Sequence, residues 1–144
     1  ILLLLIHASV TLILAGVSWF MQVVHLPLFR RVGDRVFARY MDAELRVSVL
    51  LVAGLALVEL LTAVSVLLYR PGGLPVWMPL AGLLLLVPAW VPGLMMFAPS
   101  GRLTAGFNGD DHRRLLQLNR VRVLAWTSRS VLVVWMLAVG LPAT

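Results

Sequence analysis

Four long apolar segments constrain the fold of this chain more than any other feature. They cover approximately residues 2–24, 47–69, 74–97 and 121–141. Each has about 21–24 residues, and an α-helix of that length crosses a hydrocarbon core of about 30 Å. The chain is 61% hydrophobic and only 12% charged, which leaves too little polar surface for a soluble domain of this size. The sequence therefore predicts one domain, residues 1–144, that folds as an all-α integral membrane four-helix bundle.

The first apolar segment is expected to stay in the mature protein. It is longer than the hydrophobic region of a signal peptide, which spans about 7–15 residues. No small-residue cleavage site precedes His25. We therefore interpret the segment as a membrane-spanning helix.

The distribution of arginine predicts how the helices are oriented. All twelve basic residues are arginine, and the two long connections, residues 25–46 and 98–122, carry five each. The short connection Arg70–Gly73 carries one. Because cytoplasmic loops are enriched in basic residues, we expect both long connections in the cytoplasm and both termini on the outer, periplasmic side. The predicted location is thus the bacterial inner membrane, with lipid and not nucleic acid as the partner of the positive charge.

The two long connections are expected to contain helical residues, and the third segment is expected to be an irregular helix. Residues 34–46 and 109–122 have helical patterns that lead into the second and fourth segments. They either project beyond the membrane as continuous helices or lie on the headgroups. The third segment has no ionisable residue, and of the four it should contribute least to a functional site. Its Pro88 and Pro92 should kink or break it.

The first segment carries a polar stripe that must face protein and not lipid. At about 100° per residue, its polar residues span an arc of only about 60°. These residues are His7, Thr11, Ser18, Gln22 and His25. They either satisfy backbone carbonyls and hold neighbouring helices, or form one wall of a functional site.

A carboxylate and a guanidinium lie inside the second and fourth segments. Glu59 is about midway along its segment, and Arg129 is seven residues beyond Arg122, which is about 10 Å deeper. The two side chains either pair with each other, or Arg129 extends to the headgroups while Glu59 is neutral and hydrogen-bonded.

Polar residues of three segments are expected to meet on the cytoplasmic half of the bundle. On the fourth segment they recur at spacings of three and four residues, which places them on one face. Apolar walls with a few convergent polar groups suit a planar, lipophilic, partly anionic molecule that is aromatic or quinone-like. The catalytic candidates are His25, Glu59 and Arg129; the ligand-binding candidates are Gln22, Glu44, Ser48, Asn119, Arg122 and Trp126.

Several chemistries are excluded by the residues present. There is no cysteine, which excludes disulfides, thiol redox chemistry and Cys-ligated metals. No zinc-protease motif, glycine-rich phosphate loop or Ser-His-Asp set occurs. His7 and His25 lie on one helix about 27 Å apart, and His112 falls in a connection, so one chain offers no histidine pair for haem, although two chains together could. We expect no metal and no cofactor.

Two stretches resemble a known family. They are SWFMQVVHLPLFRRVGDRVFARY (18–40) and LNRVRVLAWTSRSVLVVWML (118–137). Both are similar to small bacterial four-helix membrane proteins related to the anthrone-oxygenase-like domain family. The resemblance implies cofactor-free oxygenation of a polycyclic phenol, with His25 or Glu59 as the base and Arg129 stabilising the anion. Such sequences carry a histidine where this chain has DAEL (42–45). A weaker similarity, through the SW…LP pattern, is to membrane protoporphyrinogen oxidase.

Three functions remain open from the sequence. The first is an enzyme, oxygenase-like or another oxidoreductase, or a binding protein for a lipophilic small molecule. The second is an accessory subunit that packs on a larger membrane complex or on further copies of the chain. The third is a proton or ion path through His7, Glu59 and His25, which lacks a second buried carboxylate near the first helix.

Overall fold

The computed structural model describes residues 1–141, which contain helices and no strands. The helices are α1 (Leu2–Phe20), α2 (Leu26–Leu28), α3 (Asp34–Tyr69), α4 (Trp77–Met95), α5 (Phe97–Leu103) and α6 (Gly109–Gly140). Four helical stretches are long and apolar enough to cross a membrane: Leu2–Arg31, Asp34–Tyr69, Trp77–Leu103 and Gly109–Gly140. The prediction of an all-α chain with four such helices is confirmed.

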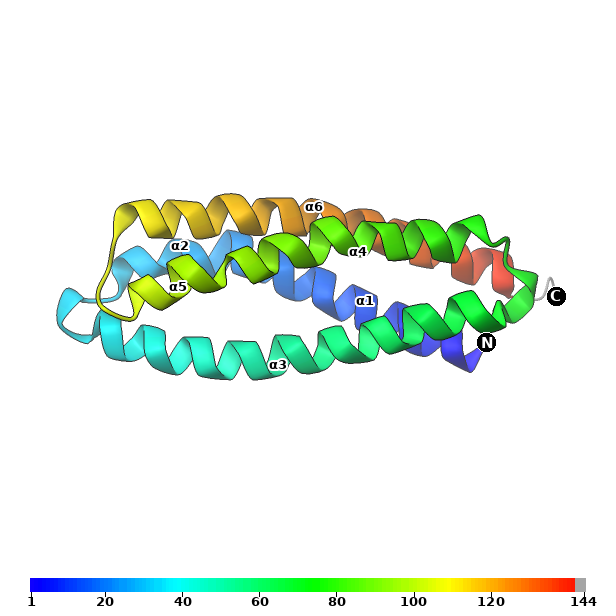
Figure 1. Ribbon diagram of the computed structural model, residues 1–144, viewed down its shortest axis with the longest axis horizontal. Helices are drawn as coiled ribbons and strands as arrows, with labels where there is room; N and C mark the ends of the chain where they lie inside the picture. The colour runs from blue at the N-terminus through cyan, green and yellow to red at the C-terminus, as the bar shows by residue number, and fades with distance from the viewer. Residues whose placement is uncertain (142–144) are drawn as a thin grey trace.

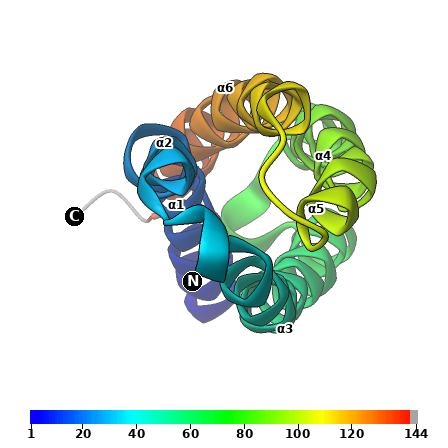
Figure 2. The same ribbon diagram turned by 90° about the vertical axis from the view of Figure 1, so that its left-hand side faces the viewer.

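The four stretches lie side by side along the long axis of the molecule (Figure 1). Seen end-on, the order around the bundle is α1, α6, α4 and α3 (Figure 2). Both termini and the short turn after α3 lie at one end, which we call the terminal end. The two long connections lie at the other, which we call the connection end. Helices α3 and α6 both run from the connection end to the terminal end.

Apolar side chains form three buried clusters, one at each end and one between them. The cluster at the terminal end contains Leu4, Val66, Leu74, Met78, Leu132 and Met136. The middle cluster contains Leu14, Ala15, Leu86, Ala89, Ala125 and Trp126. The cluster at the connection end contains Leu26, Phe29, Phe37, Met41, Met96, Leu103, Leu115 and Leu118. Many large apolar side chains are nevertheless exposed on the outside, including Leu50, Leu68 and Leu84.

Helices α3 and α6 begin much earlier than the apolar segments from which they were predicted. They have 36 and 32 residues, because residues 34–46 and 109–120 continue them without a break. At about 1.5 Å per residue, both are longer than a hydrocarbon core is thick. The start of α6 is capped by the Asn108 side chain, which accepts hydrogen bonds from the amides of Asp110 (2.9 Å) and Asp111 (3.3 Å). His112 therefore lies in the first turn of a helix and not in a loop.

Both the first and the third helical stretch continue through their prolines, although a kink or break was expected at Pro88 and Pro92 of the third. The chain stays helical through Pro27 to Arg31, because a π-helical turn at Met21–His25 precedes the proline. A wider turn can accommodate a residue that has no amide hydrogen and a ring that crowds the preceding turn. Helix α4 likewise continues through Pro88 and Pro92, and its interruption comes only at Met96, before α5.

Side-chain contacts fix the long connections to the bundle. His112 donates from Nε2 to the carbonyl oxygen of Leu26 at 2.6 Å, so the start of α6 holds the end of the first helical stretch. Arg102 of α5 pairs with Asp111 of α6 at 2.7 Å. The Phe37 ring meets Phe107 edge to face, with centroids 5.3 Å apart. The connection end is therefore an ordered part of the fold.

The cap at Asn108 gives the first testable prediction. Asn108→Ala removes an acceptor for two amides of the first turn and should lower the free energy of unfolding by about 1 kcal/mol. Denaturation of the detergent-solubilised protein in a sodium dodecyl sulfate titration measures the change. Asn108→Asp should keep the stability, and Gln117→Ala, at an exposed site within α6, serves as the control. Equal stability of Asn108→Ala and wild type would contradict the role of the cap.

Candidate functional site

The structure places most of the predicted site residues in two separate regions. Glu59 and Arg129 belong to a buried polar network that joins four helices. A cleft nearer the connection end is lined by Glu44, Ser48 and Arg122, among others. The sequence predicts all of these side chains in a single pocket, whereas the structure separates them into different regions.

An ion pair forms the centre of the buried network. The guanidinium of Arg129 donates to Glu59 Oε1 from Nη2 and to the carbonyl oxygen of Gly82 from Nη1. Both charged side chains are completely buried. Through these contacts α6 is tied to α3 and to α4. Of the two arrangements predicted for these side chains, the structure therefore shows the ion pair of Glu59 with Arg129.

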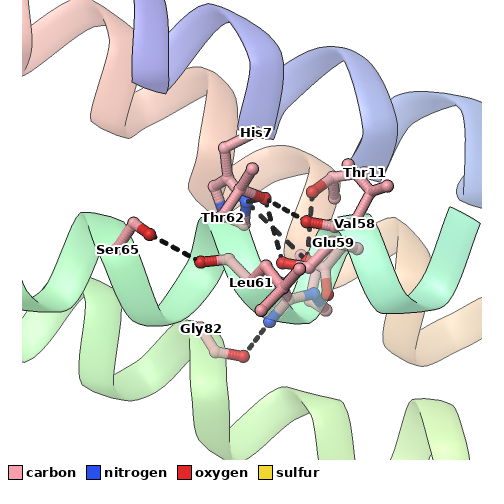
Figure 3. A network of polar contacts seen from close by, with 9 residues as sticks. His7, Thr11, Val58, Glu59, Leu61, Thr62, Ser65 and Gly82 are labelled. Carbon is pink, nitrogen blue, oxygen red and sulfur yellow. Dashed lines mark hydrogen bonds and ion pairs between the residues drawn. The ribbon is translucent and has the colours of Figure 1, made fainter.

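Side chains of α1 complete the network around Glu59. Thr11 donates to Glu59 Oε1 at 3.3 Å, and His7 Nδ1 lies 4.0 Å from the same oxygen. Figure 3 shows His7 and Thr11 reaching from α1 toward Glu59, with Gly82 on the other side. The Thr62 hydroxyl lies 3.0 Å from the carbonyl oxygens of Val58 and Glu59 and 3.0 Å from His7 Nδ1. Thr62 therefore links the His7 ring to the backbone of α3 beside Glu59.

The network is closed to other molecules. The space beside His7, Gly82 and Arg129 is too narrow to hold a water molecule. The guanidinium carbon of Arg129 also lies 5.6 Å from the centre of the Trp126 ring, a favourable cation–π distance. Glu59 and Arg129 thus hold helices together, and neither lines the cleft.

The cleft is lined by α3 on one side and by α4, α5 and α6 on the other, and Leu14 and Met21 of the first helical stretch also line it. The ribbon of α3 diverges from that of α4 along the bundle (Figure 1). The volume of the cleft is about 460 Å³, within the range of small-molecule sites. The α3 wall is made of small and aliphatic side chains, including Val52, Ala53 and Ala56. The opposite wall contributes Trp90 of α4 and Trp126 of α6. The walls are thus mainly apolar, with a few polar groups among them.

Arg122 is the cation of the cleft. Its Nε donates to the carbonyl oxygen of Ala89 at 3.3 Å, and its Nη1 lies 3.8 Å from the sulfur of Met96. Within residues 1–141 no carboxylate approaches it closely enough for an ion pair. A Cβ at position 93 would lie 3.2 Å from Arg122 Nε, so Gly93 gives the guanidinium room against α4. Trp126 Nε1 is buried and has no hydrogen-bond acceptor within residues 1–141.

His25 and Glu44 meet at the edge of the cleft. His25 Nε2 lies 2.9 Å from Glu44 Oε1, which also accepts from the Ser48 hydroxyl at 2.7 Å. Glu44 and Ser48 line the cleft, whereas His25 stands behind Glu44 and contacts Phe29 edge to face. An imidazole beside a carboxylate can take up and release a proton.

Gln22 and Asn119 lie away from the cleft. The buried Asn119 amide donates to the carbonyl oxygen of Ser18 at 3.1 Å and to Gln22 Oε1 at 3.0 Å. These bonds fasten the π-helical turn of the first stretch to α6. Gln22 and Asn119 therefore join α6 to the first helical stretch and do not line the cleft.

Sequence reasoning missed the contribution of α4. Its segment has no ionisable residue and was expected to contribute least to a functional site, yet Ala89, Trp90 and Gly93 shape the wall beside Arg122. The available signal was a tryptophan next to small residues in a proline-rich stretch. Within residues 1–141 no group of three or more His, Asp or Glu side chains is placed to hold a metal ion.

No protein-family model matches this chain, and no match was found among curated proteins or solved structures. The resemblance to proteins related to the anthrone-oxygenase-like domain family stays a prediction, as does the weaker one to membrane protoporphyrinogen oxidase.

The buried ion pair gives a second prediction. Glu59→Gln leaves the Arg129 charge buried without its partner and should lower the free energy of unfolding by about 3–5 kcal/mol. The double variant Glu59→Leu/Arg129→Met removes both charges and should recover most of the loss. Sodium dodecyl sulfate titration measures all three proteins. Asp42→Asn, which breaks the exposed pair with Arg46, should change stability by less than about 1 kcal/mol. A Glu59→Gln variant as stable as Asp42→Asn would contradict this role of the pair.

Proposed function

We propose that the chain crosses a bacterial inner membrane four times, with the connection end in the cytoplasm. The apolar outer surface of the four long helices supports insertion, because such side chains favour lipid over water. Tyr69, Trp77 and Trp135 lie near the terminal end, where aromatic residues favour a membrane interface. Exposed arginines gather at the connection end, as expected of a cytoplasmic side: Arg30, Arg31, Arg35, Arg39, Arg46, Arg102, Arg113, Arg114 and Arg120.

Within the membrane, the protein binds a lipophilic aromatic or quinone-like small molecule in the cleft between α3 and α4. The observation that carries this proposal is a volume of about 460 Å³ with apolar walls, two tryptophans and one guanidinium. Trp90 and Trp126 offer aromatic surface to a planar molecule. Arg122 offers a hydrogen-bond donor that fixes its orientation.

A catalytic function is the second candidate. The contact of His25 with Glu44 favours it, because Glu44 also lines the cleft. A proton could pass between a bound molecule and this pair. A proton path through the whole bundle has less support, since Glu59 is held in an ion pair with Arg129. The accessory-subunit alternative is supported only by the apolar outer surface, which lipid would cover equally well.

Filling the cleft tests the proposed binding. The probe is 2-methyl-1,4-naphthoquinone, a neutral quinone, added to the protein in phosphatidylcholine nanodiscs while tryptophan fluorescence is recorded. Quenching should saturate in the wild type, because Trp90 and Trp126 line the cleft. Ala56→Phe should weaken binding about tenfold or more by occupying the volume.

The matched control is Ala43→Phe, at an exposed site of α3 outside the cleft, which should bind as the wild type does. Absence of saturable quenching in the wild type, or equal binding by both phenylalanine variants, would argue against the proposed function. Recovery of a stable complex with another membrane protein, together with either result, would favour the accessory subunit.

A further inference from the structure

We infer that the ligand of the cleft is a lipophilic monoanion whose charged oxygen pairs with Arg122. The inference rests on the proposed function and adds the charge class of the bound molecule. Three features of the described residues carry it: a repeated register between α4 and α6, a carboxylate that the repeat lacks, and a guanidinium in an apolar cleft without a carboxylate partner.

Arg122 and Arg129 occupy equivalent positions in a repeat. They are seven residues apart on α6, which places them on the same face and about 10 Å apart along the axis. Arg129 donates to the carbonyl oxygen of Gly82, and Arg122 to that of Ala89. These acceptors are also seven residues apart on α4. An arginine of α6 thus donates to a backbone carbonyl of α4 at two depths, from Nη1 in Arg129 and from Nε in Arg122.

The two arginines differ in what they meet on α3. Arg129 meets Glu59, whereas the residue seven positions before Glu59 is Val52, which lines the cleft together with Arg122. Because α3 and α6 run in the same direction (Figure 1), Val52 lies at the level of Arg122. The cleft therefore opens at the place where the repeat would require a carboxylate. The pair of Arg129 with Glu59 shows which chemistry completes an arginine in this register.

The hydrogen-bond donors of the cleft favour a ligand that accepts hydrogen bonds. A guanidinium in an apolar cleft is costly unless an anion compensates its charge. Trp126 also lines the cleft, and its Nε1, which can only donate, is buried without an acceptor in the described part of the chain. The guanidinium of Arg122 suits an anionic oxygen. Glu44 lines the same cleft with one oxygen already held by Ser48 and His25, and its negative charge disfavours a ligand with a second anionic group.

The bound molecule is thus a single anionic oxygen group on an apolar body. Two sources share this chemistry: a small acid that enters from the bilayer, such as an ionised hydroxyquinone, and the phosphate of an anionic phospholipid. The experiments below separate them.

Two naphthoquinones of similar size test the charge requirement. In phosphatidylcholine nanodiscs at neutral pH, 2-hydroxy-1,4-naphthoquinone is an anion and 2-methyl-1,4-naphthoquinone is neutral. The anion should quench tryptophan fluorescence with an affinity about tenfold or more higher. Arg122→Gln should abolish this preference, while the control Arg120→Gln, at an exposed site outside the cleft, should keep it.

Failure of the inference can be told apart from failure of the proposed function. Equal affinity of the two quinones, with binding still lost in Ala56→Phe, would overturn the anion and leave the proposed function standing. A preference that persists in Arg122→Gln would also overturn the inference.

A substitution that completes the repeat gives an independent test. Val52→Glu supplies a carboxylate at the level of Arg122 and should abolish the preference for the anion. Val52→Gln has the same size and no charge, and it should bind the anion at least about tenfold better than Val52→Glu does. Equal anion binding by the two variants would overturn the inference. The stability of both is checked by sodium dodecyl sulfate titration, in which Val52→Glu should be at least as stable as Val52→Gln.

Brominated lipids identify the source of the anion. Nanodiscs are made with dibrominated phosphatidylglycerol or dibrominated phosphatidylcholine, since bromine quenches nearby tryptophan. Stronger quenching by phosphatidylglycerol that disappears in Arg122→Gln would assign the anion to a lipid headgroup. Equal quenching by both lipids, with the hydroxyquinone still preferred, would assign it to a small acid. No preference in either pair of probes would overturn the inference.

Discussion

The ion pair between Glu59 and Arg129 is the interaction on which the arrangement of the helices depends. Each charge alone would be prohibitively costly in an apolar interior, so each requires the other at one depth and in one orientation. The pair joins α3 to α6, the Gly82 carbonyl adds α4, and Thr11 adds α1. Apolar packing between membrane helices is weakly directional. A single polar centre that contacts all four long helices therefore specifies their relative positions.

The cleft follows from where this centre lies. At the level of Glu59, α3 is held against the bundle, and the terminal-end cluster with Val66 holds it further along. Toward the connection end, α3 carries Val52, Ala53 and Ala56 on the inward side, and these side chains are too small to fill the space to α4. The contact between His25 and Glu44 then brings α3 back to the first helical stretch. The cleft therefore lies beside the part of α3 between two polar contacts, the one at Glu59 and the one between Glu44 and His25.

Much of the fold could be predicted from the sequence because its signals are local. Apolar segment length gives four helices, and the helical pattern before residues 47 and 121 gives the extensions of α3 and α6 as one of two alternatives. The pairing of Glu59 with Arg129 was foreseeable as one of two alternatives, since a buried charge needs a partner. The separation of network and cleft was not foreseeable. Arg122 and Arg129 share a helical face, and no periodicity tells which of them meets a carboxylate. That depends on the spacing of Glu59 and Val52 across a helix interface. The wall formed by α4 was missed for the related reason that Gly93 acts by leaving space.

The π-helical turn at Met21–His25 separates two contacts that the first helical stretch makes, one with Glu59 and one with Glu44. A turn with an extra residue offsets the angular phase of everything after it relative to a regular helix. Before the turn, His7 and Thr11 face the centre around Glu59; after it, His25 faces Glu44, fifteen residues earlier on α3. Asn119 fastens the turn by donating to Gln22 Oε1 within it and to the carbonyl oxygen of Ser18 just before it. The first helical stretch thus contacts α3 at two levels, one on each side of the π-helical turn, so that rotating one end of the stretch about its axis would strain the contact at the other.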